Sequence, residues 1–254
     1  MSTNETVNRD DVISLTAEDI ATGSRHSERS QTKRPAARAS RTKAQGGGRR
    51  YMVLASGPDD VAAVDVHSGA MARLRVAPFA AHGHGLEPFD LIEANLSADP
   101  ERDDLAHPEA VSITGFPEVI GSAPKRQARR RLRAVLAPNE RHLLGFAGPA
   151  APYWEFRGMR PSLALVAPAL GPLLFRRKTD GTAWARFGWS RSDNWLPVED
   201  ERAVSCLWAA GSDKLAGKDL AAAIGFRPRY LLVALTPPRS GHCYKTIVAI
   251  LPRP

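Results

Sequence analysis

The amino-acid composition of the chain changes near Arg50. This change restricts the predicted folded region to the residues that follow. Residues 1–50 contain no aromatic residue and few large aliphatic ones, so they cannot bury enough apolar surface to offset the entropy lost on folding. We predict a disordered tail over residues 1–50. Residues 51–254 show short apolar runs between turn signals. They are predicted to form a single globular β-rich domain, with two closely packed subdomains as the alternative.

Charge divides the tail into an acidic and a basic part. Residues 1–21 carry five acidic residues and one basic residue, whereas residues 22–50 carry nine basic residues and one acidic residue. An extended basic segment can neutralise phosphates without folding, so residues 22–50 are a candidate arm for DNA or RNA, with a solubilising tail as the ordinary alternative. Residues 11–20 are a candidate helical recognition motif for a protein partner.

The sequence gives no sign of a membrane segment or a secretory signal. The N-terminus lacks the basic and then apolar succession of such a signal. The longest apolar stretch, Leu163–Phe175, is interrupted by proline and glycine and is too short for a bilayer. We therefore expect a cytoplasmic protein with no membrane partner. Cys206 and Cys243 are too few for a disulfide framework or a four-thiolate zinc site, and we expect both to be reduced and buried.

The first part of the predicted domain has the rhythm of short β-strands. Three apolar runs joined by turns predict a meander over Tyr51–Ala55, Val61–Val66 and Ala70–Val76. Two further strands are predicted at Phe89–Leu96 and Val111–Thr114.

Residues 125–137 are compatible with two structures. As a helix, they place Ala128, Leu132, Val135 and Leu136 on one face and Arg126, Arg129, Arg130 and Arg133 on the other. As a hairpin, they turn at Pro138-Asn139-Glu140 and return through His142–Phe146. We favour the helix. In both structures the basic cluster is a candidate surface for phosphates or an acidic partner, and its ordinary interpretation is a solvated face.

The clearest local motif is Asp180-Gly181 between two strand-like runs, which indicates a β-hairpin over residues 173–187. A two-residue turn pairs Thr179 with Thr182, Arg177 with Trp184 and Phe175 with Arg186. The opposite face is then the core candidate and carries Leu174, Ala183, Ala185, Phe187 and Trp189.

This register leaves Trp184 outside the core, beside Arg177 and Arg186. An indole between guanidinium groups offers a stacking surface and positive charge, which single-stranded nucleic acid requires. The ordinary alternatives are an exposed cation–π pair and a tryptophan covered by a neighbouring strand.

The C-terminal part is predicted to contain helices and a closing hairpin. Glu199–Ala210 indicates a helix with Val204, Leu207 and Trp208 facing inward, and Leu215–Ile224 indicates a second helix ended by Gly225. Tyr230–Leu235 and Thr246–Leu251 are matched apolar runs, which predict paired strands covered on both faces. The alternative is a helix-turn-helix over residues 217–235, which requires a helix at Pro228–Leu235.

Catalytic and metal-binding patterns are weak. His82 and His84 lack recognisable further ligands, and neighbours such as His242 and Cys243 point to opposite faces of an extended chain. Glu199, Asp200 and Glu201 suit a helix N-terminus. We therefore predict no catalytic residue, no metal and no cofactor, although an active site assembled from distant residues stays open as an alternative.

These observations predict an α+β, β-rich fold made mostly of antiparallel hairpins, with two or three helices and a partly open barrel as one arrangement. The net charge of +8 favours a non-enzymatic nucleic-acid-binding protein that uses the basic arm and a basic and aromatic face. The residues assigned to that function are Arg126, Arg129, Arg130, Arg133, Arg177, Trp184 and Arg186. The alternative is a protein-interaction or assembly module that uses residues 11–20.

Overall fold

The computed structural model describes residues 48–57, 60–75, 85–97, 106–140, 142–156 and 160–254. Nearly all of the predicted tail, including the motif at residues 11–20, lies outside the described residues, as do His82 and His84. The division into a tail and one domain therefore stays a prediction. The predicted fold class is confirmed, because the described part is β-rich, with antiparallel sheets, a closed barrel and helices.

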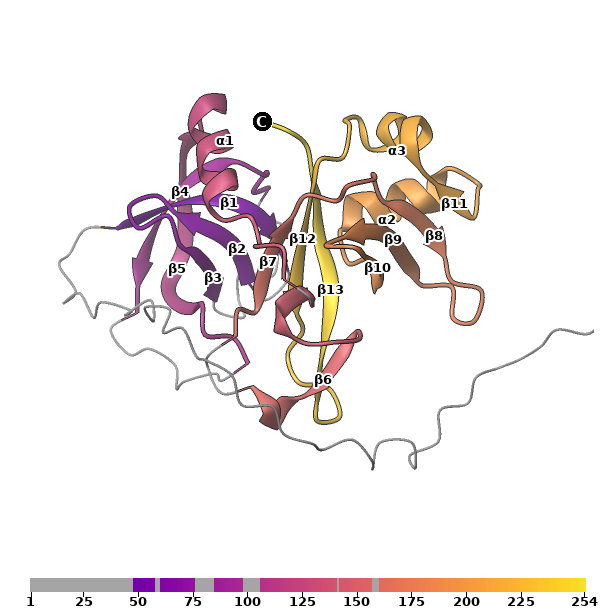
Figure 1. Cartoon of the computed structure of the whole chain (residues 1–254). Helices are drawn as coiled ribbons and strands as arrows, with labels where there is room; N and C mark the ends of the chain where they lie inside the picture. The colour runs from indigo at the N-terminus through magenta and orange to yellow at the C-terminus, as the bar shows by residue number, and fades with distance from the viewer. Residues whose placement is uncertain (1–47, 58–59, 76–84, 98–105, 141, 157–159) are drawn as a thin grey trace, which may run out of the picture. The chain divides into compact units, whose positions relative to one another are not determined.

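The first five strands close into a barrel, drawn from indigo to magenta in Figure 1. They are β1 (Arg49–Ser56), β2 (Asp60–Asp65), β3 (Met71–Arg75), β4 (Asp90–Leu96) and β5 (Ala110–Ser122). Around the barrel the order is β1-β2-β3-β5-β4, with β3 and β5 parallel and the other pairs antiparallel. The predicted meander is thereby confirmed.

Two boundaries in the barrel differ from the sequence reading. β1 begins at Arg49, so the strand includes the last two residues assigned to the tail. β5 continues well past Thr114, the predicted end, because Gly115 adopts a positive φ of 70° and the register with β4 shifts to accommodate it. Gly115 and Pro117 therefore lie in a bulge of this longer strand.

The barrel has an apolar interior, and its strands follow a known order of connection. Its core is formed by alternate residues of the strands together with Leu86, and includes Tyr51, Val53, Val61, Ala63, Leu74, Ile92 and Ile113. Strands β4, β1, β2 and β3 lie in the spatial order of a Greek key. A five-stranded Greek-key barrel is the architecture of the OB-fold.

A second sheet covers the outer face of β1 and β2. Its order is β6 (Ala150–Pro152), β13 (His242–Leu251), β12 (Tyr230–Leu235) and β7 (Leu163–Val166). Met52, Leu54, Ala62 and Val64 of the barrel pack in one cluster with Leu163, Leu165, Leu232 and Leu251 of this sheet. Every residue of β12 is buried, as predicted for a strand covered on both faces, and the paired strands exclude the helix-turn-helix.

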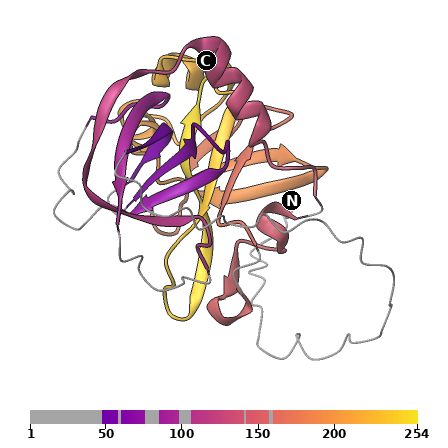
Figure 2. The same cartoon turned by 90° about the vertical axis from the view of Figure 1, so that its left-hand side faces the viewer.

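Residues 125–137 contain a helix, as favoured, and the hairpin alternative is wrong. Helix α1 (Lys125–Ala134) buries Ala128 and Leu132 in the cluster between the barrel and the second sheet, while Val135 and Leu136 pack against it half-buried. Arg126, Arg129, Arg130 and Arg133 lie exposed on the other side. Figure 2 shows α1 running along the side of the barrel.

A third sheet and two helices complete the described fold. The sheet order is β10 (Ser192–Pro197), β9 (Ala183–Trp189), β8 (Leu173–Arg176) and β11 (Lys214–Leu215). Its inner face packs with α2 (Glu201–Ala209) and α3 (Gly217–Ile224) in the largest core cluster. Single 3₁₀ turns occur at Leu143–Gly145 and Tyr153–Glu155.

The two helices largely follow the prediction. Helix α3 ends at Gly225, whose φ is 80°, as the sequence indicated. In α2, Leu207 is buried and Val204 half-buried, but the expected inward position of Trp208 is wrong. Trp208 is 39% exposed and stacks on the Arg176 guanidinium, 4.1 Å from the ring centre. An indole can remain at the surface when a guanidinium covers its face.

Two smaller expectations concern membranes and cysteines. Within the described ranges, none of the helices has the length and apolarity needed to cross a bilayer. Cys206 and Cys243 are free thiols, the second buried and the first half-buried.

Candidate functional site

The hairpin at Asp180-Gly181 forms, but with a longer turn than predicted. Phe175 pairs with Trp184, and Leu173 pairs with Arg186. The Arg177 amide donates to the Thr182 carbonyl, and Gly181, with a φ of 71°, closes a four-residue loop. The predicted pairs of Arg177 with Trp184 and Phe175 with Arg186 are therefore wrong by two residues.

A shift of two residues preserves the two faces of a strand, so the predicted core face is correct. Leu174, Ala183, Ala185, Phe187 and Trp189 are all buried. The other face carries the side chains that we call the aromatic face: Phe175, Arg177, Trp184, Arg186 and Trp195.

Trp195 of β10 is a member of this face that sequence reasoning missed. It pairs across the strands with Arg186, is 48% exposed, and its ring centre lies 5.5 Å from that of Phe175 in an edge-to-face arrangement. The sequence predicts a polar turn at Ser190–Asn194 before Trp195-Leu196-Pro197, whereas Ser192–Pro197 forms strand β10. The alternation of Trp195 with the buried Leu196 was the available signal for a strand.

Each tryptophan on the aromatic face is held by an arginine and by a hydrogen bond. The Arg177 guanidinium lies 4.9 Å from the Trp184 ring centre, and that of Arg186 lies 5.1 Å from the Trp195 ring centre. Trp184 Nε1 donates to the hydroxyl of Thr182 (2.9 Å), and Trp195 Nε1 donates to Asp193 (3.1 Å). These contacts fix the orientation of the indoles before any ligand arrives.

Carboxylates balance the two arginines. Arg177 pairs with Asp180 at 3.4 Å, and Arg186 pairs with Asp193 at 2.8 Å. Hydrogen bonds from Thr182 lower the pKa of Asp180 and so favour its charged form. The aromatic face therefore offers flat stacking surfaces with little net charge.

The arginines of α1 form a separate, uncompensated patch. Arg126, Arg129, Arg130 and Arg133 are all exposed, and α1 contains no acidic residue. Arg129 donates to the backbone oxygen of Pro254, whereas the other three have no hydrogen bond or ion pair within the described part of the chain. Figure 1 shows α1 beside the barrel and β8–β10 beyond the β12–β13 hairpin, so the structure does not bring the two groups together.

Two positions of the proposed basic arm belong to the barrel. Arg49 pairs with Asp65 at 3.7 Å and Arg50 with Glu93 at 3.1 Å, both on β1. The remaining basic residues of the arm lie outside the described residues.

The barrel face that binds oligonucleotides in OB-folds, on strands 2 and 3, is covered in this chain. Ala62 and Val64 of β2 are buried against the second sheet, and Arg73 of β3 donates to the Leu235 carbonyl of β12. An oligonucleotide could reach this face only by separating the two sheets. The exposed aromatic face is therefore the better candidate for a binding surface.

The described residues bring no catalytic constellation together. His242 Nδ1 lies 3.2 Å from the Ser240 carbonyl, while Cys243 is fully buried, in keeping with their expected opposite directions. Asp200 accepts from the Ala203 amide as the N-cap of α2, and also from the Ile250 amide. Within the described residues, His, Cys, Asp and Glu side chains form no group suited to a metal ion.

A buried lysine was not singled out from the sequence. Lys245 of β13 is 3% exposed, and its Nζ donates to the carbonyls of Phe146 (2.6 Å) and Gly148 (2.8 Å). Burial lowers the pKa of Lys245 to about 8. Its contacts connect β13 to the segment before β6, and so indicate a structural role.

Comparisons of the chain with protein-family models and with curated proteins returned no match.

Proposed function

We propose that this protein binds single-stranded nucleic acid and that bases stack on the aromatic face. The observation that supports the proposal is the arrangement of Phe175, Trp184 and Trp195 on the exposed side of one sheet, with the indoles held by arginines and hydrogen bonds. Exposed aromatic side chains on a sheet are a common platform for unpaired bases, because every base has a flat face. Duplex DNA does not offer its bases in this way.

The arginines of α1 would contribute in a different manner. Arg126, Arg130 and Arg133 are exposed and lack partners within the described ranges, so they can attract phosphates at long range. This attraction depends on salt. The proposal therefore assigns orientation and stacking to the aromatic face, and electrostatic attraction to α1 and to the arm at residues 22–50, in a non-enzymatic protein of the cytoplasm.

Fluorescence anisotropy with labelled oligouridylate and oligothymidylate tests the proposal on the full chain. Trp184→Ala and Trp195→Ala should each weaken binding at least about fivefold, since stacking on an aromatic side chain contributes about 1–3 kcal/mol per base. Trp208→Ala is the matched control, because Trp208, like Trp195, is an exposed, arginine-stacked tryptophan but lies on α2. It should leave the affinity unchanged.

The salt dependence of binding distinguishes the contribution of α1 from that of the aromatic face. The double variant Arg126→Gln/Arg130→Gln should weaken binding at about 50 mM salt and reduce the dependence of affinity on salt, whereas the tryptophan variants should leave that dependence unchanged. If the full chain shows no binding at low salt, or if all three tryptophan variants behave alike, the proposal is wrong. Residues 11–20 would then be the next segment to test, by their deletion in a search for a protein partner.

A further inference from the structure

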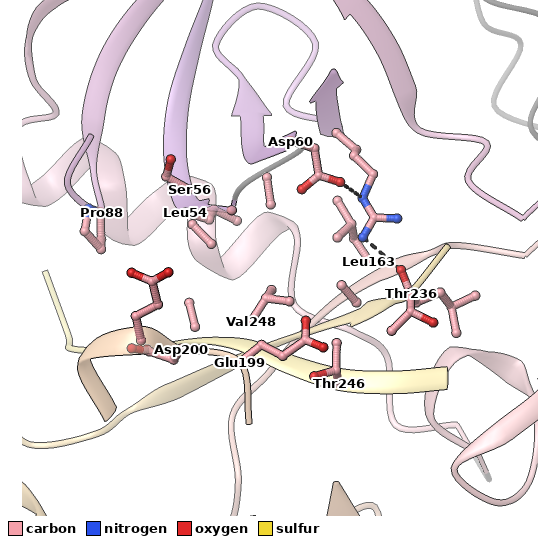
Figure 3. Close-up of a pocket in the computed structure, with 18 of the residues that line it drawn as sticks. Leu54, Ser56, Asp60, Pro88, Leu163, Glu199, Asp200, Thr236, Thr246 and Val248 are labelled. Carbon is pink, nitrogen blue, oxygen red and sulfur yellow. Dashed lines mark hydrogen bonds and ion pairs between the residues drawn. The ribbon is translucent and has the colours of Figure 1, made fainter. Parts of the chain in front are cut away.

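A cavity of about 390 Å³ lies between the barrel and the second sheet. Figure 3 shows Leu54, Ser56 and Asp60 on the barrel side, and Thr246 and Val248 on the side of the second sheet. Glu199 and Asp200, just before α2, complete that side. The volume falls within the range of small-molecule sites, which often occur where two packed units meet.

The cavity has an apolar wall and a polar rim. Leu54, Ala62, Leu163, Leu235 and Val248 supply apolar surface from both sheets. Five acidic residues and three arginines line the rest, which gives the lining a formal charge of −2 in a chain whose net charge is +8. The cavity is thus acidic although the protein is basic.

Two of the five carboxylates are already used by the fold. Asp60 pairs with Arg73 at 2.7 Å, and the same guanidinium donates to the Leu235 carbonyl at 3.0 Å. Asp200 accepts from two backbone amides, one at the start of α2 and one on β13. These groups support the walls of the cavity.

The other three carboxylates, Glu87, Glu199 and Glu201, have no such role. Their side chains are exposed and make no hydrogen bond or ion pair within the described residues. Asp200 already caps α2, so Glu199 and Glu201 are not required to satisfy its first amides. Of the lining arginines, Arg202 donates to the Ile250 carbonyl and stacks on Phe226, so its position is also fixed.

We propose that this cavity binds a small organic cation, an amine or guanidinium carried on an apolar body. The apolar part would contact Leu163 and Val248, and the cationic group would lie among Glu87, Glu199 and Glu201 at the rim. An anion of the same shape is disfavoured, because it would face three carboxylates without ion-pair partners against one exposed arginine, Arg239. This site is independent of the aromatic face and of nucleic-acid binding.

Three probes that share one apolar body test the proposal: 4-phenylbutylamine, 4-phenylbutanol and 4-phenylbutanoate. Binding to the full chain is followed by NMR of methyl groups, with Val248 and Leu163 as reporters. The amine should bind about fivefold tighter than the alcohol, the range expected for exposed ionic contacts, and the carboxylate should bind most weakly. The amine should shift the Val248 and Leu163 signals.

Variants that remove carboxylates test whether the charge of the rim, and not only the shape of the cavity, determines binding. Glu199→Gln/Glu201→Gln should weaken binding of the amine about fivefold and leave that of the alcohol unchanged. Glu118→Gln is the control, because Glu118 is an exposed acid on β5 that does not line the cavity. The proposal is overturned if the amine and the carboxylate bind equally, if the double variant and the control behave alike, or if the amine leaves the Val248 signal unshifted.

Discussion

Two sheet faces in this protein differ in their exposure to solvent. The outer face of β1 and β2 is buried beneath the second sheet, whereas the outer face of β8–β10 is open and aromatic. Both belong to antiparallel strands whose other face packs into a core. In β2 every residue after the first is buried, while β9 alternates strictly between buried and more accessible positions.

The outward side chains account for the difference. Ala62 and Val64 of β2 offer only apolar surface, so covering them is favourable, with about 1.5–3 kcal/mol for a fully buried valine. Trp184 and Arg186 of β9 carry polar groups that need partners, and covering them would require every such group to be satisfied again. Such a face can remain exposed in the free protein and is therefore available to a ligand.

A charge placed on the covered face should have the largest effect. Val64 is fully buried, so Val64→Asp should lower the free energy of unfolding by more than about 3 kcal/mol. Ser192→Asp, at the exposed start of β10, should change it by less than about 0.5 kcal/mol. Urea denaturation followed by tryptophan fluorescence measures both.

Val64→Thr covers the case in which the aspartate variant does not fold. It keeps the shape of the side chain but adds an unpaired hydroxyl, and should cost about 1–3 kcal/mol. If both Val64 variants retained the stability of the parent, the contact between the barrel and the second sheet would not support the fold.

Lys245 is a charged residue buried in the second sheet next to Phe146 of the largest core cluster, and its effect should depend on pH. In the folded protein its pKa is lowered to about 8 from 10.5. Between these values the unfolded chain binds the proton and the folded chain does not, so the free energy of unfolding rises with pH, by roughly 1 kcal/mol per pH unit. Below pH 8 both states are charged, and the cost of burial is fully present.

The matched variant for this prediction is Lys245→Met, which lacks the titrating group. The stability of the wild type relative to Lys245→Met should rise between pH 8 and 10.5 and stay flat below pH 8. Urea titrations at pH 7, 9 and 10 measure the difference. A difference that does not change with pH would show that Lys245 is hydrated in the folded protein.

Local patterns predicted most elements of the fold, because they depend on neighbouring residues. The meander at Tyr51–Val76, the hairpin at Asp180-Gly181 and the end of α3 at Gly225 are all determined by turn chemistry and alternation. The length of β5 and the position of Trp208 were missed, because a bulge and a stacking arginine are set by strands and side chains elsewhere in the fold.

The candidate sites were less predictable for the same reason. Trp184 could be placed outside the core from the parity of its strand alone, even though its pairing was wrong by two residues. Trp195 joins the aromatic face only because β10 pairs with β9. The acidic cavity combines Asp60 with Glu199, residues far apart in sequence, and no local pattern connects them.

Tyr51, in the interior of the barrel, offers a smaller test. Its hydroxyl lies near Arg49 in the barrel interior without forming a hydrogen bond within the described residues, whereas both indole N–H groups of the open face have partners. Tyr51→Phe should therefore leave the free energy of unfolding unchanged or raise it by up to about 1 kcal/mol. A loss of more than 1 kcal/mol would reveal a hydrogen bond to the hydroxyl.

The Tyr51→Phe variant should also differ from the wild type in how its stability depends on pH. Burial raises the pKa of Tyr51 above 10, so at higher pH the unfolded chain loses the proton first and the wild type loses stability. Tyr51→Phe should not show this loss. Thermal unfolding at pH 9 and pH 11 compares the two proteins, and parallel behaviour would contradict the raised pKa.

The smallest expected effect comes from an ion pair on the open face. Arg186–Asp193 and Arg73–Asp60 have nearly equal distances, 2.8 and 2.7 Å, but the side chains of the first pair are about half exposed and Arg73 is almost fully buried. A double-mutant cycle with Arg186→Gln and Asp193→Asn should give a coupling of at most about 0.5 kcal/mol. The cycle with Arg73→Gln and Asp60→Asn should give a larger coupling, because solvent screens a buried pair less. Equal couplings would mean that burial does not distinguish the two faces energetically, and that water reaches Arg73 between the barrel and the second sheet.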